Sequence, residues 1–185
     1  MRMGWKGDLV RLVPLDRNVH FEACLRWIND PEVTEWLGMP DIPMTRGAEE
    51  AWFERMEQSK NDIIFAIETH EGQHIGQSGI HGIDWKNGVA TTGSYIADPE
   101  LRNQGFGTDA AKVRSHYCFE VLGLRLLTSG YLAGNEKSKK MQEKAGYLEY
   151  GCLPNAIWKR GKYRDHVLTH LTAERWRALR ADNAK

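Results

Sequence analysis

Hydrophobic residues recur along the chain at two spacings, and each spacing predicts its own kind of element. In residues 9–15 (LVRLVPL) apolar and polar positions alternate, as in a half-buried strand. In residues 17–28 apolar positions recur every three or four residues behind Asp16, whose side chain can cap a helix. By the same criteria we expect helices at about 31–37, 46–58, 108–122 and 136–145, and strands at 62–69, 74–84, 89–96, 124–132, 147–153 and 163–173.

Turn residues between these elements indicate the topology. Asn87-Gly88 predicts a two-residue β-hairpin between the strands on either side, and the KRG segment ending at Gly161 predicts a turn between the last two strands. Neither an internal repeat nor a linker interrupts the order of elements. We therefore expect an α/β fold of one domain, residues 1–185, with one mixed sheet and helices on both faces.

Composition adds limits on function. The chain has 185 residues, 41% hydrophobic and 27% charged, with a formal net charge of zero, which is typical of a globular domain and argues against a general nucleic-acid binder. The early third is nevertheless acidic and the late third basic. Solvated helix faces would account for both runs, and ligands of opposite charge are the alternative. The acidic run is Asp30, Glu32, Glu35, Asp41, Glu49, Glu50, Glu54 and Glu57.

The cysteines and the N-terminus concern the compartment. Cys24, Cys118 and Cys152 are odd in number and include no close pair, which argues against a disulfide framework or a zinc site. We expect each to be a small buried hydrophobe and expect no metal. The first residues lack the apolar core of a signal peptide, and no apolar run reaches membrane length. The sequence therefore predicts a cytoplasmic protein that does not bind a membrane.

Residues 101–111 (LRNQGFGTDAA) form the strongest local motif. Gly105 and Gly107 stand between a predicted strand and a predicted helix, with Arg102 in front of them. Free backbone N–H groups, close approach at glycine and the positive end of a helix together bind phosphate oxygens. Thr108 and Asp109 stand where a P-loop requires lysine and a hydroxyl. A dinucleotide fingerprint is also excluded, because the preceding strand ends a hairpin. A plain structural turn is the alternative.

The Arg-x-x-Gly-x-Gly pattern resembles the acyl-coenzyme A pyrophosphate loop of the GCN5-related N-acetyltransferases (GNAT). The order of further segments is similar to the RimJ/RimL-type subgroup over nearly the whole chain: DLVRLVPLD, RWINDPEV, FAIE, IGQSGIHGID, GNEKS, EKAGYLEYG and GKYRD. The resemblance implies the GNAT fold, a central mixed and largely antiparallel sheet flanked by helices. It also implies an enzyme that transfers acetyl directly from acetyl-CoA, the acyl-donor co-substrate, to a primary amine.

The resemblance further assigns residues that hold the coenzyme. Backbone N–H groups would bind the pyrophosphate over the segment Gln104, Gly105, Phe106, Gly107 and Thr108, with Arg102 and Asn103 nearby. The backbone of Tyr95, Ile96 and Ala97 would pair with the pantetheine arm and polarise the thioester carbonyl. Asn135 would contact the pantetheine, and Ser138 would face the sulfur and protonate the leaving thiolate. Without the resemblance, Asn135 and Ser138 are an ordinary helix start.

The general base is less well defined. Many relatives carry a tyrosine that acts as the general acid where this chain has Gln142. Some carry a glutamate that acts as the general base where this chain has Tyr150. Glu149 is shifted by one residue, which on a strand points to the other face. The candidates for a catalytic role are Tyr150 at that position, His81 and Asp84 on the predicted hairpin and Glu35 in the early acidic segment, and the alternative is no residue base at all. The walls of the acceptor cleft are expected to include Glu35, Trp36 and Trp85.

The acceptor amine must be neutral to attack. An α-amine with a pKa near ~7.7 is roughly 15% neutral at pH 7, whereas a polyamine or lysine amine near ~10.4 is only about 0.04% neutral. An enzyme without a strong base therefore favours the N-terminal α-amine of a protein or peptide. The alternatives are a small amine (a polyamine, an aminoglycoside or an amino-acid derivative) and a non-catalytic acetyl-CoA-binding module. A monomer and a homodimer are both compatible with the sequence.

Overall fold

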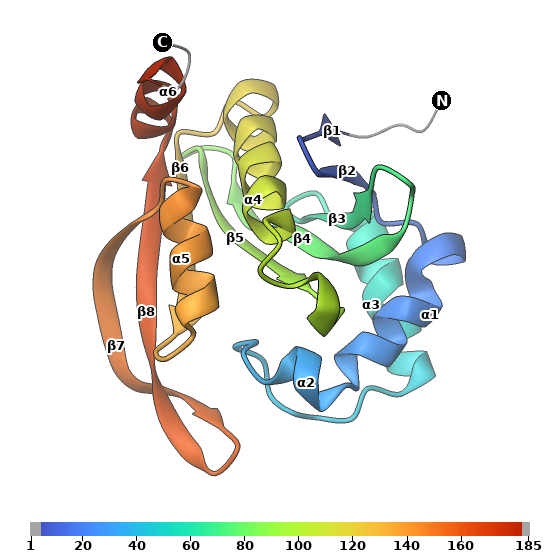
Figure 1. Ribbon diagram of the computed structural model, residues 1–185. Helices are drawn as coiled ribbons and strands as arrows, with labels where there is room; N and C mark the ends of the chain where they lie inside the picture. Colours follow the sequence, from blue (N-terminus) through green and yellow to red (C-terminus); the bar gives the residue numbers. More distant parts are fainter. Residues whose placement is uncertain (1–4, 183–185) are drawn as a thin grey trace.

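The computed structural model describes residues 5–182, and within them an eight-stranded sheet forms the centre (Figure 1). Its strand order is β1-β2-β3-β4-β5-β6-β8-β7. Neighbouring strands are antiparallel except β5 and β6, which are parallel, so the sheet is mixed and largely antiparallel as predicted. The strands are β1 Trp5–Lys6, β2 Val10–Pro14, β3 Ile63–Thr69, β4 His74–Asp84, β5 Val89–Ile96, β6 Leu126–Leu132, β7 Leu148–Lys159 and β8 Lys162–Thr172.

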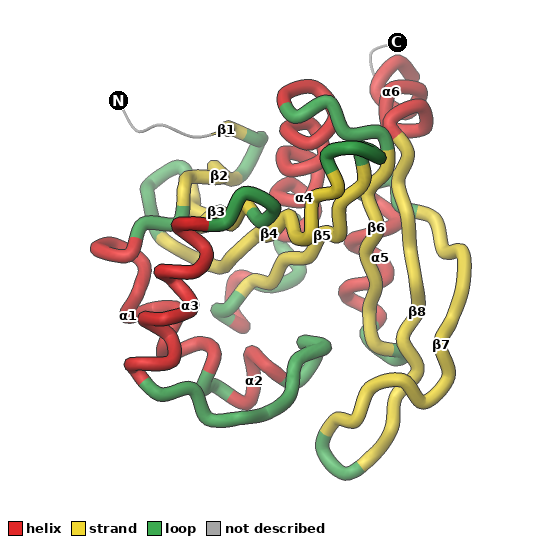
Figure 2. Tube along the Cα trace, turned by 180° about the vertical axis from the view of Figure 1, so that it is seen from behind, coloured by secondary structure: helices red, strands yellow, loops and turns green. Residues whose placement is uncertain are grey.

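Helices cover both faces of this sheet, which confirms the expected fold class. Figures 1 and 2, drawn from opposite sides, show α4 and α5 over one face and α1 and α3 over the other. Asp16 and Thr45 cap α1 and α3 through their side chains, as the sequence indicated. The helices are α1 Arg17–Ile28, α2 Pro31–Thr34, α3 Arg46–Gln58, α4 Phe106–His116, α5 Glu136–Lys144 and α6 Ala173–Asp182, with a 3₁₀ turn at Pro99–Leu101 and a π-helical turn at Tyr117–Val121.

The two parallel strands separate part of the way along. β5 pairs with β6 only over Val89–Thr91, whereas its pairing with β4 continues to Ile96. β6 in turn stays paired with β8 as far as Leu132. From Thr91 onward the two strands therefore diverge, and a V-shaped opening lies between them. We call this feature the β5–β6 opening; it points toward the loop that leads into α4.

The structure adds two elements to the sequence predictions and corrects two others. β1 and α6 were not predicted, and α6 carries only a short apolar stripe whose Trp176 packs on Phe119 at 5.5 Å between ring centroids. The β4–β5 connection is four residues long rather than two, because the Asp84 carboxylate accepts hydrogen bonds from the backbone and side-chain N–H groups of Asn87. Cys152 is exposed, since its strand β7 is the sheet edge.

None of the helices within residues 5–182 combines the length and the apolar character that crossing a bilayer requires.

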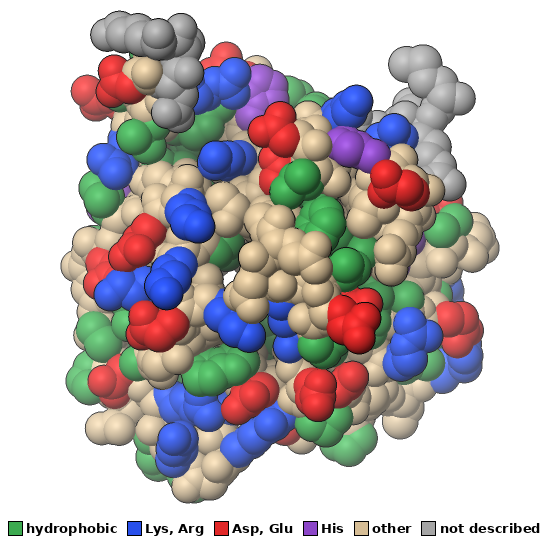
Figure 3. All heavy atoms as spheres, in the orientation of Figure 1, with side chains coloured by type: hydrophobic (Ala, Val, Ile, Leu, Met, Phe, Trp, Pro, Cys, Tyr) green, Lys and Arg blue, Asp and Glu red, His purple; other side chains and the backbone are tan. Residues whose placement is uncertain are grey.

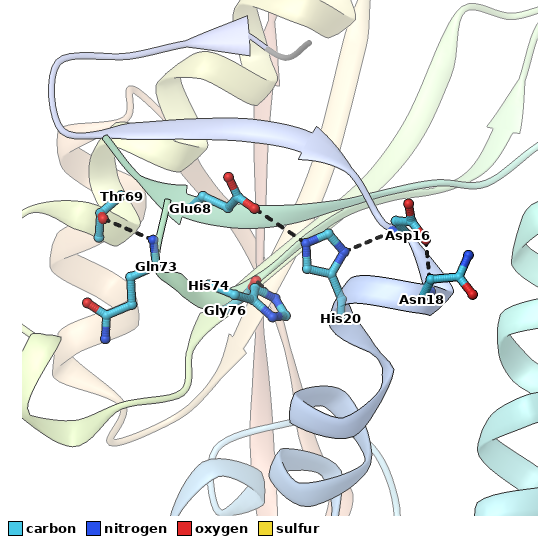
Figure 4. A network of polar contacts seen from close by, with 8 residues as sticks. All are labelled: Asp16, Asn18, His20, Glu68, Thr69, Gln73, His74 and Gly76. Atoms are coloured by element: carbon cyan, nitrogen blue, oxygen red, sulfur yellow. Dashed lines mark hydrogen bonds and ion pairs between the residues drawn. The ribbon is translucent and has the colours of Figure 1, made fainter. Parts of the chain in front are cut away.

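A buried polar network ties α1 to the sheet (Figure 4). Nδ1 of His20 accepts a hydrogen bond from the Asp16 backbone at 2.9 Å, and its Nε2 lies 3.5 Å from Glu68 on β3. The ring of His74 on β4 lies beside it, 4.6 Å between centroids, and contacts the Gly76 carbonyl. Burial, reinforced by the positive potential of His20, lowers the pKa of His74 to about 4.

The depressed pKa of His74 predicts acid sensitivity. In the unfolded chain the imidazole titrates near about 6.5, so between pH 6.5 and 4 only the unfolded state binds the proton. The free energy of unfolding therefore keeps its full value above about pH 6.5 and falls by up to roughly 3 kcal/mol as the pH drops to 4. Denaturant unfolding of wild type and His74→Gln across this range measures the difference. Parallel stability curves for the two proteins would contradict the assignment.

Candidate functional site

The free edge of β5 faces the β5–β6 opening. The Ala97 N–H donates to the Ile75 carbonyl on β4 at 2.8 Å. Because backbone groups alternate sides along a strand, those of Tyr95 also face β4, and those of Ser94 and Ile96 face the opening. Of the three residues predicted to pair with pantetheine, the structure therefore aims only the Ile96 backbone into the opening. Ser94, which the sequence reasoning missed, is the second.

Arg102 closes the end of this edge. Its Nε donates to the Ile96 carbonyl at 3.0 Å and its NH2 to the Ala97 carbonyl at 2.8 Å. The side chain thus fixes the loop onto the end of β5, where the sequence suggested a direct phosphate contact. By this alternation, the edge groups without a partner in residues 5–182 are the N–H and C=O of Ser94 and the N–H of Ile96.

Arg114 of α4 forms hydrogen bonds to the same strand from the face of the sheet that α4 covers. Its NH1 donates to the Gly93 carbonyl at 2.9 Å and to Ser78 Oγ at 3.0 Å, and its side chain is fully buried. The two bonds fix the position of β5 where it diverges from β6, and this part of β5 carries the free edge.

The glycine loop presents backbone donors at the N-terminus of α4. Asn103 and Gly105 have φ angles of 64° and 94°, the left-handed region, and no side chain caps the helix. The first N–H with an acceptor in the helix is that of Asp109, bonded to the Gly105 carbonyl at 2.9 Å. Across the described chain, the N–H groups of Gly105 to Thr108 have no acceptor. Four free donors at a helix N-terminus suit an anionic group such as a pyrophosphate.

Asp109 holds this loop in place. Its buried carboxylate accepts three backbone hydrogen bonds, from Asp8 at 3.2 Å, Leu9 at 2.8 Å and Val10 at 3.0 Å. Gly7 passes so close that a Cβ there would lie 2.3 Å from Asp109 Oδ2. The first turn of α4 is therefore attached to the start of β2.

The N-terminus of α5 lies across the opening from this loop. An added Cβ at Gly107 would touch Ile96 and Met141 at 3.8 Å, so α4, β5 and α5 meet there. Figure 3 shows a hollow between α5 and the loop before α4, with Lys and Arg side chains gathered over α5. The lysines of this helix are Lys137, Lys139, Lys140 and Lys144.

Ser138 stands in the first turn of α5. Asn135 caps the helix, and its Oδ1 accepts from the Ser138 N–H at 3.1 Å. Gln142, at the tyrosine position of relatives, is buried: its Nε2 donates to the Gly130 carbonyl at 3.1 Å and toward Ser138 Oγ at 3.4 Å, and its Oε1 accepts from Thr169. Since Gln142 donates to the Ser138 oxygen, the Ser138 hydroxyl proton is free to donate elsewhere.

Two imidazoles flank the opening on the opposite face of the sheet, the face covered by α1 and α3. His81 on β4 lies over Gly79, with its Nδ1 3.5 Å from Asp62 Oδ1. His166 on β8 lies over Gly130 on β6, so close that a Cβ there would be 2.4 Å from its Nε2. Burial lowers the pKa of both, and Asp62 partly opposes this for His81. His81 was predicted from the sequence, and His166 was not.

Glu35 and Trp36 reach the open end of the same face. The Trp36 ring approaches Gly134, next to Asn135, and would lie 3.8 Å from a Cβ there. The guanidinium of Arg164 on β8 stacks 4.5 Å from the Trp36 ring centroid, and Glu35 Oε1 lies 4.0 Å from its NH2. The structure thus brings these two predicted cleft residues to the opening.

Three other predicted residues lie elsewhere. Asp84 and Trp85 belong to the β4–β5 turn, at the closed end of β5, about 23 Å from Ile96 along the strand. Trp85 there donates to the Lys60 carbonyl and to Asn61, both at 3.1 Å. Tyr150 lies on the edge strand β7, exposed and against His170. Glu149 faces α5 and bonds Tyr131, on the other side of that strand.

Comparison with known proteins identifies the architecture. The family model of the Acetyltransferase (GNAT) domain matches residues 10–148. The chain is 31% identical over 107 residues to the "Putative ribosomal N-acetyltransferase YdaF" of Bacillus subtilis (strain 168), an alignment covering 58% of each protein. It is 24% identical over 173 residues to the SPbeta prophage-derived uncharacterized N-acetyltransferase YokL of the same strain, covering 92% of this chain and 93% of YokL.

The fold is shared with a solved polyamine enzyme. Spermidine N-acetyltransferase from Vibrio cholerae, in complex with CoA and spermine, superposes with a TM-score of 0.84 over 90% of this chain and 97% of that one. At 18% identity this likeness concerns the fold alone.

Proposed function

Because the chain belongs to the GNAT acetyltransferase family, we propose that it transfers the acetyl group of acetyl-CoA directly to the N-terminal α-amine of a protein or peptide. The observation that carries the proposal is the free edge of β5 beside the N-terminus of α4, which no side chain caps. The first suits an extended amide-bearing arm, the second a pyrophosphate, and acetyl-CoA carries both.

Backbone groups of the chain can hold the donor at both places. When bound, acetyl-CoA supplies an acetyl group already activated as a thioester. The N–H groups of Gly105 to Thr108 donate to phosphate oxygens, with the lysines of α5 on the same side of the molecule (Figure 3). Ser94 and Ile96 pair with the pantetheine arm as an added strand would. An N–H at this edge also stabilises negative charge on the thioester oxygen.

Ser138 serves the leaving group in this proposal. Gln142 Nε2 points at its oxygen, so the hydroxyl proton is directed away from Gln142 and can reach a thiolate in the opening. The glutamine that replaces the tyrosine of relatives thereby orients the proton donor rather than acting as one.

His81 and His166 are the bases that suit an α-amine. With pKa values below the ordinary imidazole value of about 6.5, both are neutral at pH 7 and able to accept a proton. An α-ammonium, with a pKa near ~7.7, lies closer to these lowered imidazole pKa values than a polyamine ammonium, with a pKa near ~10.4. Proton transfer is therefore better matched to the α-amine.

The charge around the acceptor face supports the same choice. Asp41 is paired with Lys159 at 2.7 Å, Glu35 faces Arg164, and Asp30 caps α2. Cations of the chain thus neutralise two acidic residues that could otherwise attract a polycation. A ligand with a single positive charge needs no stronger acidic field.

A comparison of acceptors tests the proposed function. Two peptides of one sequence, each with an internal lysine and one with a blocked N-terminus, are incubated with the enzyme and acetyl-CoA beside spermidine. Mass spectrometry should show acetyl on the free N-terminus alone. Acetylation of the internal lysine in the blocked peptide, or of spermidine in preference to both peptides, would contradict the proposed acceptor.

Ser138→Ala should lower turnover by about tenfold to a hundredfold and leave acetyl-CoA affinity within about twofold, because the hydroxyl acts on the departing thiolate and the cap bond uses backbone N–H. Ser115→Ala is the matched control, because the Ser115 hydroxyl donates to the Ala111 carbonyl within α4. Unchanged turnover at saturation would restrict Ser138 to its place in the helix start.

A further inference from the structure

Arg164 is a mostly buried cation whose guanidinium has no hydrogen bond to another described residue. Its side chain is 11% exposed, and its guanidinium stacks 4.5 Å from the Trp36 ring centroid. Its guanidinium N–H groups donate no hydrogen bond to another described residue, and its Nε is buried without a partner. Glu35 Oε1 lies 4.0 Å from NH2, an ion pair beyond hydrogen-bond distance.

Two other cations near this end of the sheet have hydrogen-bond partners. Lys159 Nζ donates to the Asp41 carboxylate at 2.7 Å and to the Met39 carbonyl at 2.9 Å, and Arg160 bonds the Pro31 carbonyl. A guanidinium stays charged at any physiological pH, so Arg164 cannot relieve its burial by losing a proton. A planar fork with free donors is matched to a carboxylate, which accepts two parallel hydrogen bonds.

Arg164 lies where an acceptor would approach. It is two residues from His166 on the same face of β8, about 7 Å along the strand. The Ala133 N–H donates to the Asp165 carbonyl at 2.9 Å, which attaches this part of β8 to the turn before Asn135. Trp36 bridges from Arg164 to Gly134 in that turn. The cation therefore stands at the rim of the β5–β6 opening.

We propose that Arg164 binds a carboxylate carried by the acceptor a few ångströms from its reactive amine. The inference rests on the acetyl transfer of the proposed function and restricts the acceptor to amines with a nearby acidic group, with a free amino acid as the alternative to the proposed peptide. That group is either the side chain of an aspartate or glutamate among the first residues of a peptide or the α-carboxylate of a free amino acid. Glu35, 38% exposed, is the internal carboxylate that such an acceptor displaces.

Matched acceptor pairs test the inference. One pair of peptides differs only by Glu or Gln at the second position, and a second pair is a free amino acid and its amide. Wild type should acetylate the acidic member of at least one pair with roughly 10- to 100-fold higher kcat/KM. Preference within the peptide pair identifies a side-chain carboxylate, and preference within the other pair an α-carboxylate.

Variants separate recognition from folding. Arg164→Gln should bring the acid-to-amide ratio close to one, Arg164→Lys should keep part of it, and Arg160→Gln, the control, should leave it unchanged. Glu35→Gln should raise the ratio, because the competing carboxylate is gone. A ratio that Arg164→Gln does not change, or that Glu35→Gln lowers, would overturn the inference. An equal loss on both members of a pair would assign Arg164 a structural role only.

A binding measurement keeps the inference separate from the proposed function. If no acceptor is acetylated, the proposed function fails. Calorimetric titration of the same pairs onto the enzyme with CoA then shows whether Arg164 binds a carboxylate. Tighter binding of the acidic member by wild type, lost in Arg164→Gln, supports carboxylate recognition without any turnover. Equal binding of both members by wild type overturns it.

Discussion

Gly105→Glu should abolish acetyl-CoA binding, with an affinity loss of at least about a hundredfold. The substitution puts a carboxylate in front of the free N–H groups that open α4, where a pyrophosphate is expected. Each charge-assisted hydrogen bond lost is worth roughly 1.5–3 kcal/mol, and one tenfold step in affinity is about 1.4 kcal/mol. Isothermal titration calorimetry with acetyl-CoA measures the loss.

Two further variants separate charge from backbone strain at Gly105. Gly105→Ala carries the same penalty for a φ of 94° and the same approach to Leu9, 3.1 Å from an added Cβ, but no charge. It should bind acetyl-CoA more tightly than Gly105→Glu. Gly161→Glu places the same side chain at a φ of 81° with open space around it, and should bind like wild type. Wild-type affinity in Gly105→Glu would remove the loop from the coenzyme site.

Asp109→Ala should destabilise the protein by roughly 3 kcal/mol or more and weaken acetyl-CoA binding with it. The substitution leaves the N–H groups of Asp8, Leu9 and Val10 without their acceptor, and Val10 is fully buried. For a chain of this size the loss corresponds to a fall in Tm of about 6–12 °C. Thermal unfolding with and without acetyl-CoA measures both effects.

Asp8→Ala is the matched control for Asp109. It lies beside the same hydrogen bonds, its own side chain is exposed, and its backbone N–H keeps its bond to Asp109. Its Tm should stay within about 2 °C of wild type, as for an ordinary surface substitution. Equal losses in the two variants would show that the Asp109 carboxylate does not fix the start of α4.

Local patterns predicted most of the elements because they are properties of neighbouring residues. The caps Asp16, Thr45 and Asn135 and the alternation of the central strands all lie at their predicted places. α6 was missed because its apolar residues are few and its packing partner Phe119 lies far away in the chain. The four-residue β4–β5 turn depends on side-chain bonds of Asp84 that the Asn-Gly pair alone does not indicate.

The candidate site was predictable only where its residues are close together in the sequence. The glycine loop and the start of α5 could be found from short motifs. Which backbone groups of β5 face the opening depends on its register with β4, which assigns Ser94 and Ile96 where the sequence suggested Tyr95 and Ala97 as well. The bonds of Arg102 to the Ile96 and Ala97 carbonyls could not be predicted for the same reason, because the fold brings these partners to it.

His166 and Arg164 could be recognised as candidate site residues only once the strand order was known. β8 inserts between β6 and β7, so that alternate residues of the last strand reach the rim of the opening. No sequence spacing relates them to Gly130 or to Trp36, which lie about 35 and 130 residues earlier in the chain. A histidine and an arginine on an alternating strand otherwise look like ordinary surface residues.

Residue-resolved amide hydrogen exchange with and without acetyl-CoA tests directly whether the coenzyme binds in the β5–β6 opening. We expect the coenzyme to slow exchange at Ser94, Ile96 and Gly105 to Thr108, while exchange at Tyr95 and Ala97, whose N–H groups already face β4, changes little. Exchange slowed at those two residues instead, or unchanged along both β5 and the start of α4, would contradict the claim that acetyl-CoA binds in the β5–β6 opening.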